Sequence, residues 1–226
     1  MEASQAGSPS HAAADTIREW VARFVPTTPL SQRAFDLAQH SLPQPILNHS
    51  LRVFIFAKWL AEKENSSLAS DEHQLDLLFV SCICHDLGAT DRHNGPERFE
   101  CCGADAAVSF LESQSVSKAD AHQVWTAVAL HTSPGIAERI DPFTRLVRLG
   151  VLLDFRPRSR VEHGADEYFN EIVAEIPRVD IEKYLGDAVV AQAVANPDKA
   201  PAASWPGVLL RSHLEDPTWS GVNRAF

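Results

Sequence analysis

Apolar side chains recur every three or four residues along most of this chain. In the segment 71–87, for example, Leu75, Leu78, Phe79 and Cys82 fall on one side of a helix with 3.6 residues per turn. No segment shows the alternation of apolar and polar residues that is typical of a half-buried strand. The sequence therefore predicts an all-α fold, in which helices bury their apolar faces against one another.

The breaks in this spacing predict a single domain, a helical bundle of about seven to nine helices. A length of 226 residues is enough for one large domain. Residues 1–14, rich in alanine and serine, are expected to form a disordered arm before a domain that occupies 15–226. After residue 196 the chain is rich in proline and tryptophan, and we expect an irregular tail that packs back through Trp205 or Trp219. The predicted helical segments are 15–26, 30–40, 46–64, 71–87 (ended by a left-handed Gly88), 99–113, 117–132, 142–155, 165–176 and 180–195.

The net charge and the cysteine content indicate which classes of partner and which cellular compartment to expect. The formal net charge is −10, from 20 Lys and Arg against 30 Asp and Glu, which disfavours nucleic acid and an anionic membrane as partners. This net charge is compatible with a small-molecule substrate and with a homo-oligomer. The four cysteines form two close pairs with no signal-peptide core before them, so we expect no disulfide framework. No run approaches the ~18 apolar residues of a membrane span, and the expected compartment is the cytoplasm.

Ionisable residues interrupt three of the predicted apolar helices. His85 and Asp86 end the apolar run 79–84, Asp154 ends the run 149–153, and His49 lies on the apolar side of the segment 46–64. A buried carboxylate is costly unless it is paired or bound to a cation. Two imidazoles and two carboxylates from three helices satisfy this requirement if they converge on one divalent metal ion.

The ordered set His49, His85, Asp86 and Asp154 resembles the HD-domain superfamily of metal-dependent hydrolases. The resemblance covers residues 45–156, about half of the chain, and implies a helical metal core there. Closer likeness is to the fungal cyanamide hydratase-like branch. The local sequences that carry it are Asn48-His49-Ser50-Leu51-Arg52-Val53-Phe54, Cys84-His85-Asp86-Leu87 with Thr90-Asp91, and Phe99-Glu100 with Gly103.

This resemblance implies one divalent ion, zinc in the first place and iron or manganese as alternatives. Its ligands map onto His49, His85, Asp86 and Asp154. In that branch a metal-activated water adds to the nitrile carbon of cyanamide to give urea. For this chain we expect Asp86 to shuttle the proton and His131 to position water or substrate. The expected substrate contacts are Arg52, Glu100 and Phe155.

Two stretches that flank the expected pocket depart from that branch. They are Leu130-His131-Thr132-Ser133 and Phe155-Arg156-Pro157, and they leave the substrate open. One alternative is an HD-type phosphohydrolase acting on nucleotides, although Ala89 stands where several such enzymes carry a glutamate. Another is a degenerate metal-binding regulatory module, which predicts missing ligands. A cavity of a few water volumes would fit cyanamide, whereas a long cleft would not.

Overall fold

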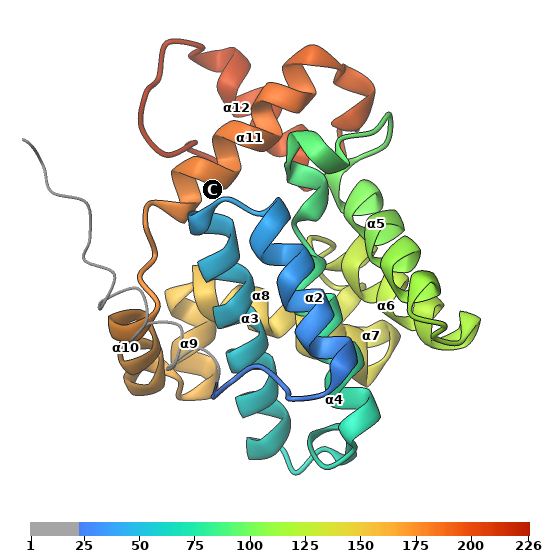
Figure 1. Cartoon of the computed structure of the whole chain (residues 1–226). Coiled ribbons are helices and arrows are strands. Elements are labelled where there is room, and N and C mark those ends of the chain that lie inside the picture. Colours follow the sequence, from blue (N-terminus) through green and yellow to red (C-terminus); the bar gives the residue numbers. More distant parts are fainter. Residues whose placement is uncertain (1–22) are drawn as a thin grey trace, which may run out of the picture.

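The computed structural model describes residues 23–226 of the chain. Within these residues it contains eleven α-helices, four short 3-10 helices and no strand, and none of its helices has the length and hydropathy to cross a membrane. The predicted all-α fold is confirmed, with slightly more helices than expected. The predicted arm and most of the predicted helix 15–26 lie outside the described residues. The α-helices, labelled as in Figure 1, are α2 (Pro29–Ser41), α3 (Gln44–Lys63), α4 (Glu72–Cys84), α5 (Phe99–Ser113), α6 (Lys118–Leu130), α7 (Ala137–Ile140), α8 (Pro142–Phe155), α9 (Pro157–His163), α10 (Asp166–Glu175), α11 (Ile181–Ala195) and α12 (Trp205–Glu215).

The tail after residue 196, predicted to be irregular, contains the helix α12. Its Pro206 lies in the first turn, where the missing N–H of proline has no helical partner to lose. The Ser204 side chain accepts a hydrogen bond from the backbone N–H of Gly207 and caps this helix. The stretch 156–164, left between two predicted helices, is likewise the helix α9, which begins at Pro157. Both prolines lie in the first turn of a helix, and the prediction of an irregular tail is wrong for the residues of α12.

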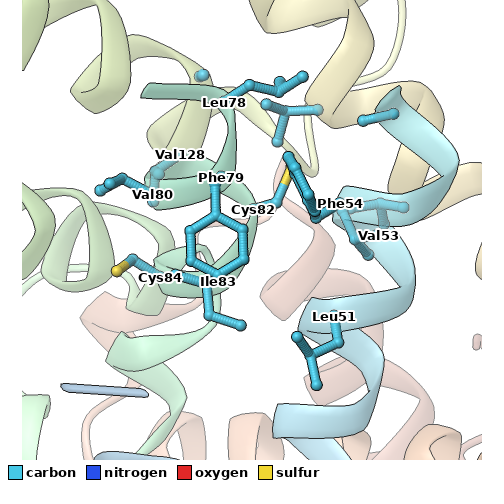
Figure 2. Close-up of a cluster of buried hydrophobic side chains, with 14 of the residues drawn as sticks. Leu51, Val53, Phe54, Leu78, Phe79, Val80, Cys82, Ile83, Cys84 and Val128 are labelled. Carbon is cyan, nitrogen blue, oxygen red and sulfur yellow. The ribbon is translucent and has the colours of Figure 1, made fainter. Parts of the chain in front are cut away.

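Helix α4 lies at the centre of the bundle. It packs against α2, α3, α5, α6 and α8, and every residue from 77 to 84 is buried. Figure 2 shows side chains of α3 and α4 meeting in this core, where the rings of Phe54 and Phe79 pack edge-to-face with centroids 4.9 Å apart. Because α4 has no exposed face along this stretch, the residues that follow its C-terminal end also lie inside the molecule.

Two glycines permit close approach between elements around this core. A Cβ at Gly150 of α8 would lie 2.5 Å from the carbonyl oxygen of Val53 of α3. Gly88, in the 3-10 helix η2 (Leu87–Ala89), would place a Cβ 1.9 Å from the carbonyl oxygen of Phe99 at the start of α5. Gly88 does not have a positive φ, so the predicted left-handed stop is wrong. The position requires glycine because α5 passes directly against it.

Helices α11 and α12 pack against each other and lie together at one end of the bundle (Figure 1). Helix α11 also contacts α3 and η2, the short helix that follows α4. The C-terminal part of the chain therefore reaches the end of the molecule at which the buried helix α4 ends.

The close contact between α3 and α8 yields a stability prediction. The substitution Gly150→Ala places a methyl group against the backbone of α3, and overpacking of this kind is expected to lower the free energy of unfolding by about 2 kcal/mol. Gly186→Ala on α11 is the matched control, because its Cβ would meet only ordinary contacts, the nearest at 3.5 Å. That variant is expected to be neutral or slightly stabilised, since alanine favours a helix. Urea denaturation measures both, and equal stability of the two variants would contradict the packing argument.

Candidate metal centre

Four buried ionisable side chains meet at this end of the bundle. His49 lies within α3, His85 and Asp86 follow the last residue of α4, and His131 follows the last residue of α6. Each of these side chains is at most 3% exposed. The apolar runs of α4 and α6 pass through the core, so their buried C-terminal ends carry polar side chains into the interior.

Ring nitrogens of three histidines face the carboxylate of Asp86. The Nε2 atom of His85 lies 3.1 Å from Asp86 Oδ2, and that of His49 lies 3.7 Å from the same oxygen. The two Nε2 atoms of His49 and His85 are 3.2 Å apart. The Nε2 atom of His131 lies 3.5 Å from Asp86 Oδ1. The structure thus brings together four of the residues that the sequence singled out.

The opposite nitrogen of each ring is held by a fixed acceptor. Nδ1 of His85 lies 2.7 Å from the carbonyl oxygen of Cys82, and Nδ1 of His131 lies 2.6 Å from that of Val128. A carbonyl oxygen only accepts, so these Nδ1 atoms carry the hydrogen. Nδ1 of His49 similarly donates to the carboxylate of Asp154 at 2.6 Å. In the neutral rings, all three Nε2 atoms therefore direct lone pairs towards a carboxylate.

The charge states agree with this arrangement. Burial lowers the pKa of His49 to about 4, so its ring is neutral at pH 7. Burial opposes ionisation of Asp86, but His85 and His131 together hold the pKa of that carboxyl well below its usual value. Burial also disfavours the charged form of His85, yet the attraction of Asp86 raises its pKa. Positive charge is favoured at this point, and a bound cation would supply it more fully than a proton.

The donor set fits one divalent ion. Ligand atoms of His49, His85 and Asp86 all lie within 4.8 Å of one another. Within the described part of the chain, neither oxygen of Asp86 has a hydrogen-bond partner, although both are buried. Tetrahedral ligands about 2.1 Å from a zinc ion lie about 3.4 Å apart, and the three separations here are 3.1, 3.2 and 3.7 Å. Buried and unpartnered, this carboxylate is best satisfied by a cation.

Asp154, predicted as the fourth ligand, lies behind His49. Its Oδ2 accepts hydrogen bonds from His49 Nδ1 at 2.6 Å and from Arg52 Nη2 at 2.8 Å. Its Oδ1 accepts from Arg52 Nε at 2.7 Å and from Arg178 Nη1 at 3.0 Å. Both oxygens are engaged, so Asp154 does not converge with His49, His85 and Asp86 as expected, but holds the His49 ring from behind. A carboxylate in this position fixes a histidine ring and raises its basicity.

The three predicted substrate contacts have different surroundings. Arg52 is fully buried, and besides Asp154 it donates to the backbone of Ile176 and Pro177, so it does not reach the pocket described below. Glu100 is also buried; it supports the pocket wall through Arg98 and Thr132 without lining the pocket itself. Phe155 does line the pocket, and its ring centroid lies 4.3 Å from that of His49.

The side chains of His49, His85, Asp86 and His131 are called the histidine cluster below. A pocket of about 590 Å³ opens above this cluster. His49, His85, Asp86 and His131 line it, with Val151, Leu152 and Phe155 of α8 along one side. Residues from the C-terminal part of the chain form another side: Ala202, Ala203, Ser204, Trp205, Val208, Arg211 and Phe226. The volume is far greater than a few water molecules occupy, since each takes about 30 Å³ in the liquid.

Several residues that line or support the pocket were not predicted from the sequence. Arg98, Arg148 and Arg211 line the pocket, but none belongs to a motif that marks it as functional. Arg178, which bonds to Asp154, lies between two helices and gives no signal in the sequence either. Trp205 was expected to pack back on the domain, and its ring lies 5.9 Å from that of Phe99. The alternative anchor, Trp219, is half exposed.

The buried pairing of Asp154 yields a second prediction. Asp154→Asn keeps the shape of the side chain but removes the charge that faces Arg52, and breaking a buried ion pair is expected to cost about 3–5 kcal/mol. Loss of the support behind His49 should also weaken metal binding by about 10–100-fold. Urea denaturation of the metal-free protein and a competition titration with zinc measure the two effects.

Glu64→Gln is the matched control for this substitution. It also changes an acid that pairs with arginine to an amide, but the Glu64–Arg145 pair is about one-third exposed. Its loss is expected to cost less than about 1 kcal/mol and to leave zinc affinity unchanged. A similar cost for both substitutions would show that Asp154 carries no special role.

Comparison with known proteins agrees with this geometry. The family model described as "HD domain" matches residues 46–163, slightly more than half of the chain. Cyanamide hydratase DDI2 and cyanamide hydratase DDI3 of Saccharomyces cerevisiae are each 29% identical to it over 68 residues. That stretch covers 30% of this chain and 29% of each of those proteins, so the chain matches less than a third of their length. The extent of the family match, which includes the three histidines and the aspartate of the cluster, shows that this chain belongs to the HD domain family.

Proposed function

We propose that this protein is a metal-dependent enzyme that uses an activated water molecule to hydrate or hydrolyse a small organic substrate. The observation that carries the proposal is the buried, unpartnered carboxylate of Asp86, which faces the Nε2 atoms of three histidines at the base of a pocket. The similarity to HD-domain proteins and, over a short stretch, to cyanamide hydratases supports it. The net charge of −10 favours a small-molecule substrate over nucleic acid.

His49, His85 and Asp86 would hold the ion. Two nitrogen donors and one carboxylate oxygen suit zinc, and they are also acceptable to iron or manganese. A divalent ion held there supplies a Lewis acid and lowers the pKa of bound water towards neutrality. Asp154 keeps the His49 ring in the orientation that presents Nε2, through its bond to Nδ1.

Asp86 and His131 are placed to move a proton. Asp86 has one oxygen next to His85 and the other 3.5 Å from His131 Nε2. The His131 ring is fixed by its Nδ1 donor, so its Nε2 can accept a proton or position a water molecule. Phe155 covers the His49 ring and keeps bulk water from that side. These are general acid–base and positioning roles for side chains already held rigidly.

Two reactions are candidates for this site. Hydration of a nitrile such as cyanamide, with water adding across the carbon–nitrogen bond, is supported by the partial similarity to the yeast enzymes. The volume of the pocket weighs against cyanamide as a sole substrate, because a molecule of three heavy atoms would fill little of 590 Å³. Phosphoester hydrolysis is favoured by four arginines in the pocket wall: Arg98, Arg148, Arg156 and Arg211.

The proposed metal centre is tested by metal content. The zinc-reconstituted protein is expected to bind one ion per chain, and His85→Gln and Asp86→Asn are each expected to weaken binding by more than about 100-fold, beyond the range of outer-shell changes. His131→Gln should retain the ion and lose turnover. His73→Ala, which removes an exposed histidine, is the control. Elemental analysis and zinc competition measure these effects; unchanged zinc affinity in Asp86→Asn would refute the centre.

The proposed reaction is tested by turnover on matched substrates. Chelation should abolish activity, and added zinc, iron or manganese should restore it. Formation of urea from cyanamide would assign the hydratase reaction, and release of phosphate from nucleoside monophosphates would assign the phosphohydrolase reaction. One bound ion per chain with no turnover on either would favour a binding module. Full activity in metal-free protein would exclude the metal-dependent mechanism.

A further inference from the structure

The wall of the pocket is cationic although the protein as a whole is acidic. Among the described residues that line it, four are arginines and Asp86 is the single acid. Asp86 belongs to the proposed metal centre, so it is not available to balance the arginines. The other charged side chains of the lining are all arginines, and a lining of this kind favours an anionic guest.

The four arginines of the pocket differ in their hydrogen-bond partners. Arg98 pairs with Glu100 at 2.7 Å, and Arg148 pairs with Glu138 at 3.2 Å. Arg156 and Arg211 instead donate to backbone oxygens, those of Phe226 and Ala202. In the part of the chain that the structure describes, neither forms an ion pair with an acidic side chain.

Two of these cations also repel each other. Arg148 is half-buried, and burial together with the nearby charge of Arg156 lowers its pKa, although Glu138 opposes the shift. The guanidinium groups of Arg148, Arg156 and Arg211 border the same pocket. An anion bound beside them would offset this repulsion by accepting charge-assisted hydrogen bonds.

Aromatic rings form a continuous wall beside these cations. The Phe155 ring, which packs on His49, meets the Phe226 ring edge-to-face with centroids 4.9 Å apart. Phe226 in turn meets Trp205 at 5.5 Å. All three rings line the pocket, and neighbouring rings meet nearly at right angles, so one side of it offers an apolar aromatic surface that begins at a proposed metal ligand. Such a surface favours apolar groups.

Part of this wall lies outside the HD-domain match. That match ends at residue 163, so it includes Phe155 and Arg156, whereas Trp205, Arg211 and Phe226 follow it. Helix α12, at the end of the bundle in Figure 1, carries Trp205 and Arg211. The histidine cluster thus lies wholly within the match, whereas the wall of the pocket combines residues from within the match with residues that follow it.

We propose that the pocket selects an anionic organic molecule with an apolar body, recognised by Arg156 and Arg211 and by the aromatic wall of Phe155, Trp205 and Phe226. This inference rests on the proposed function, because it assumes that the pocket above the histidine cluster is the substrate site. The anionic group is a carboxylate or a phosphate. The apolar body lies along the aromatic wall and directs its far end towards the histidine cluster.

Binding of matched aromatic probes tests the proposal. Isothermal titration of the full chain, in zinc-loaded and zinc-free form, compares 4-cyanobenzoate and phenyl phosphate with neutral benzonitrile. At least one anionic probe is expected to bind more than about tenfold tighter than benzonitrile, as expected for charge-assisted hydrogen bonds. The tighter of the two anionic probes identifies the group. Equal affinity for charged and neutral probes, or no binding at millimolar concentration, would overturn the proposal.

Arginine variants locate the site of recognition. Arg156→Gln and Arg211→Gln are each expected to weaken binding of the anionic probe by about five- to tenfold and to leave benzonitrile unaffected. Arg158→Gln is the control, because its side chain is 91% exposed and lies outside the pocket. Trp205→Leu should weaken all three probes, and its thermal unfolding shows whether the fold is intact. An equal loss in Arg158→Gln would overturn the assignment.

The two proposals fail in distinguishable ways. If the zinc-free protein binds the anionic probe through Arg211 but no zinc binds, the metal-dependent function is wrong and the anion pocket stands. If zinc binds stoichiometrically but the probes show no preference for charge, the metal centre stands and the inferred substrate class is wrong. Retention of the preference in zinc-free protein also shows that the arginines, and not the metal, hold the anion.

Discussion

The buried carboxylate of Asp154 connects the elements on which the site depends. It lies at the end of α8 and accepts hydrogen bonds from two side chains of α3, His49 and Arg52, and from Arg178 just before α11. Arg52 donates further to the backbone between α10 and α11. The buried negative charge of Asp154 would strongly destabilise the fold if any of these hydrogen-bond partners were missing. The same interaction that fixes the crossing of α3 and α8 therefore sets the orientation of the His49 imidazole, a ligand of the proposed metal centre, and the path of the chain into α11.

Burial has opposite consequences for the two aspartates of the site. Asp154 is satisfied by arginines and by a histidine N–H, so its charge is balanced within the protein. Asp86 meets ring nitrogens whose hydrogens are committed to the opposite side, and its oxygens have no donor within the described residues. The contrast explains why one carboxylate acts as a structural anchor while the other needs an added cation. Similar sequence contexts, each an acid after an apolar run, lead to different chemistry.

The pocket is assembled from two parts of the chain. The helices within the HD-domain match place the histidine cluster at its base. Helix α12 and the residues around it close the other side with aromatic and cationic groups. Because the base is rigid and deeply buried while the wall is partly exposed, the wall can differ between relatives without disturbing the core.

The all-α fold could be predicted from the sequence, because its apolar spacing follows the helical period. The same reasoning singled out His49, His85, Asp86 and His131, because polar residues in apolar runs must find buried partners. The segments around Pro157 and Pro206 were expected to be irregular, but a proline in the first turn of a helix does not interrupt it. The positions of Asp154 behind His49, of Arg52 in the interior, and of Arg211 and Phe226 at the pocket depend on tertiary contacts. Helical periodicity fixes which face of a helix is buried, but which side chains meet depends on how distant helices cross.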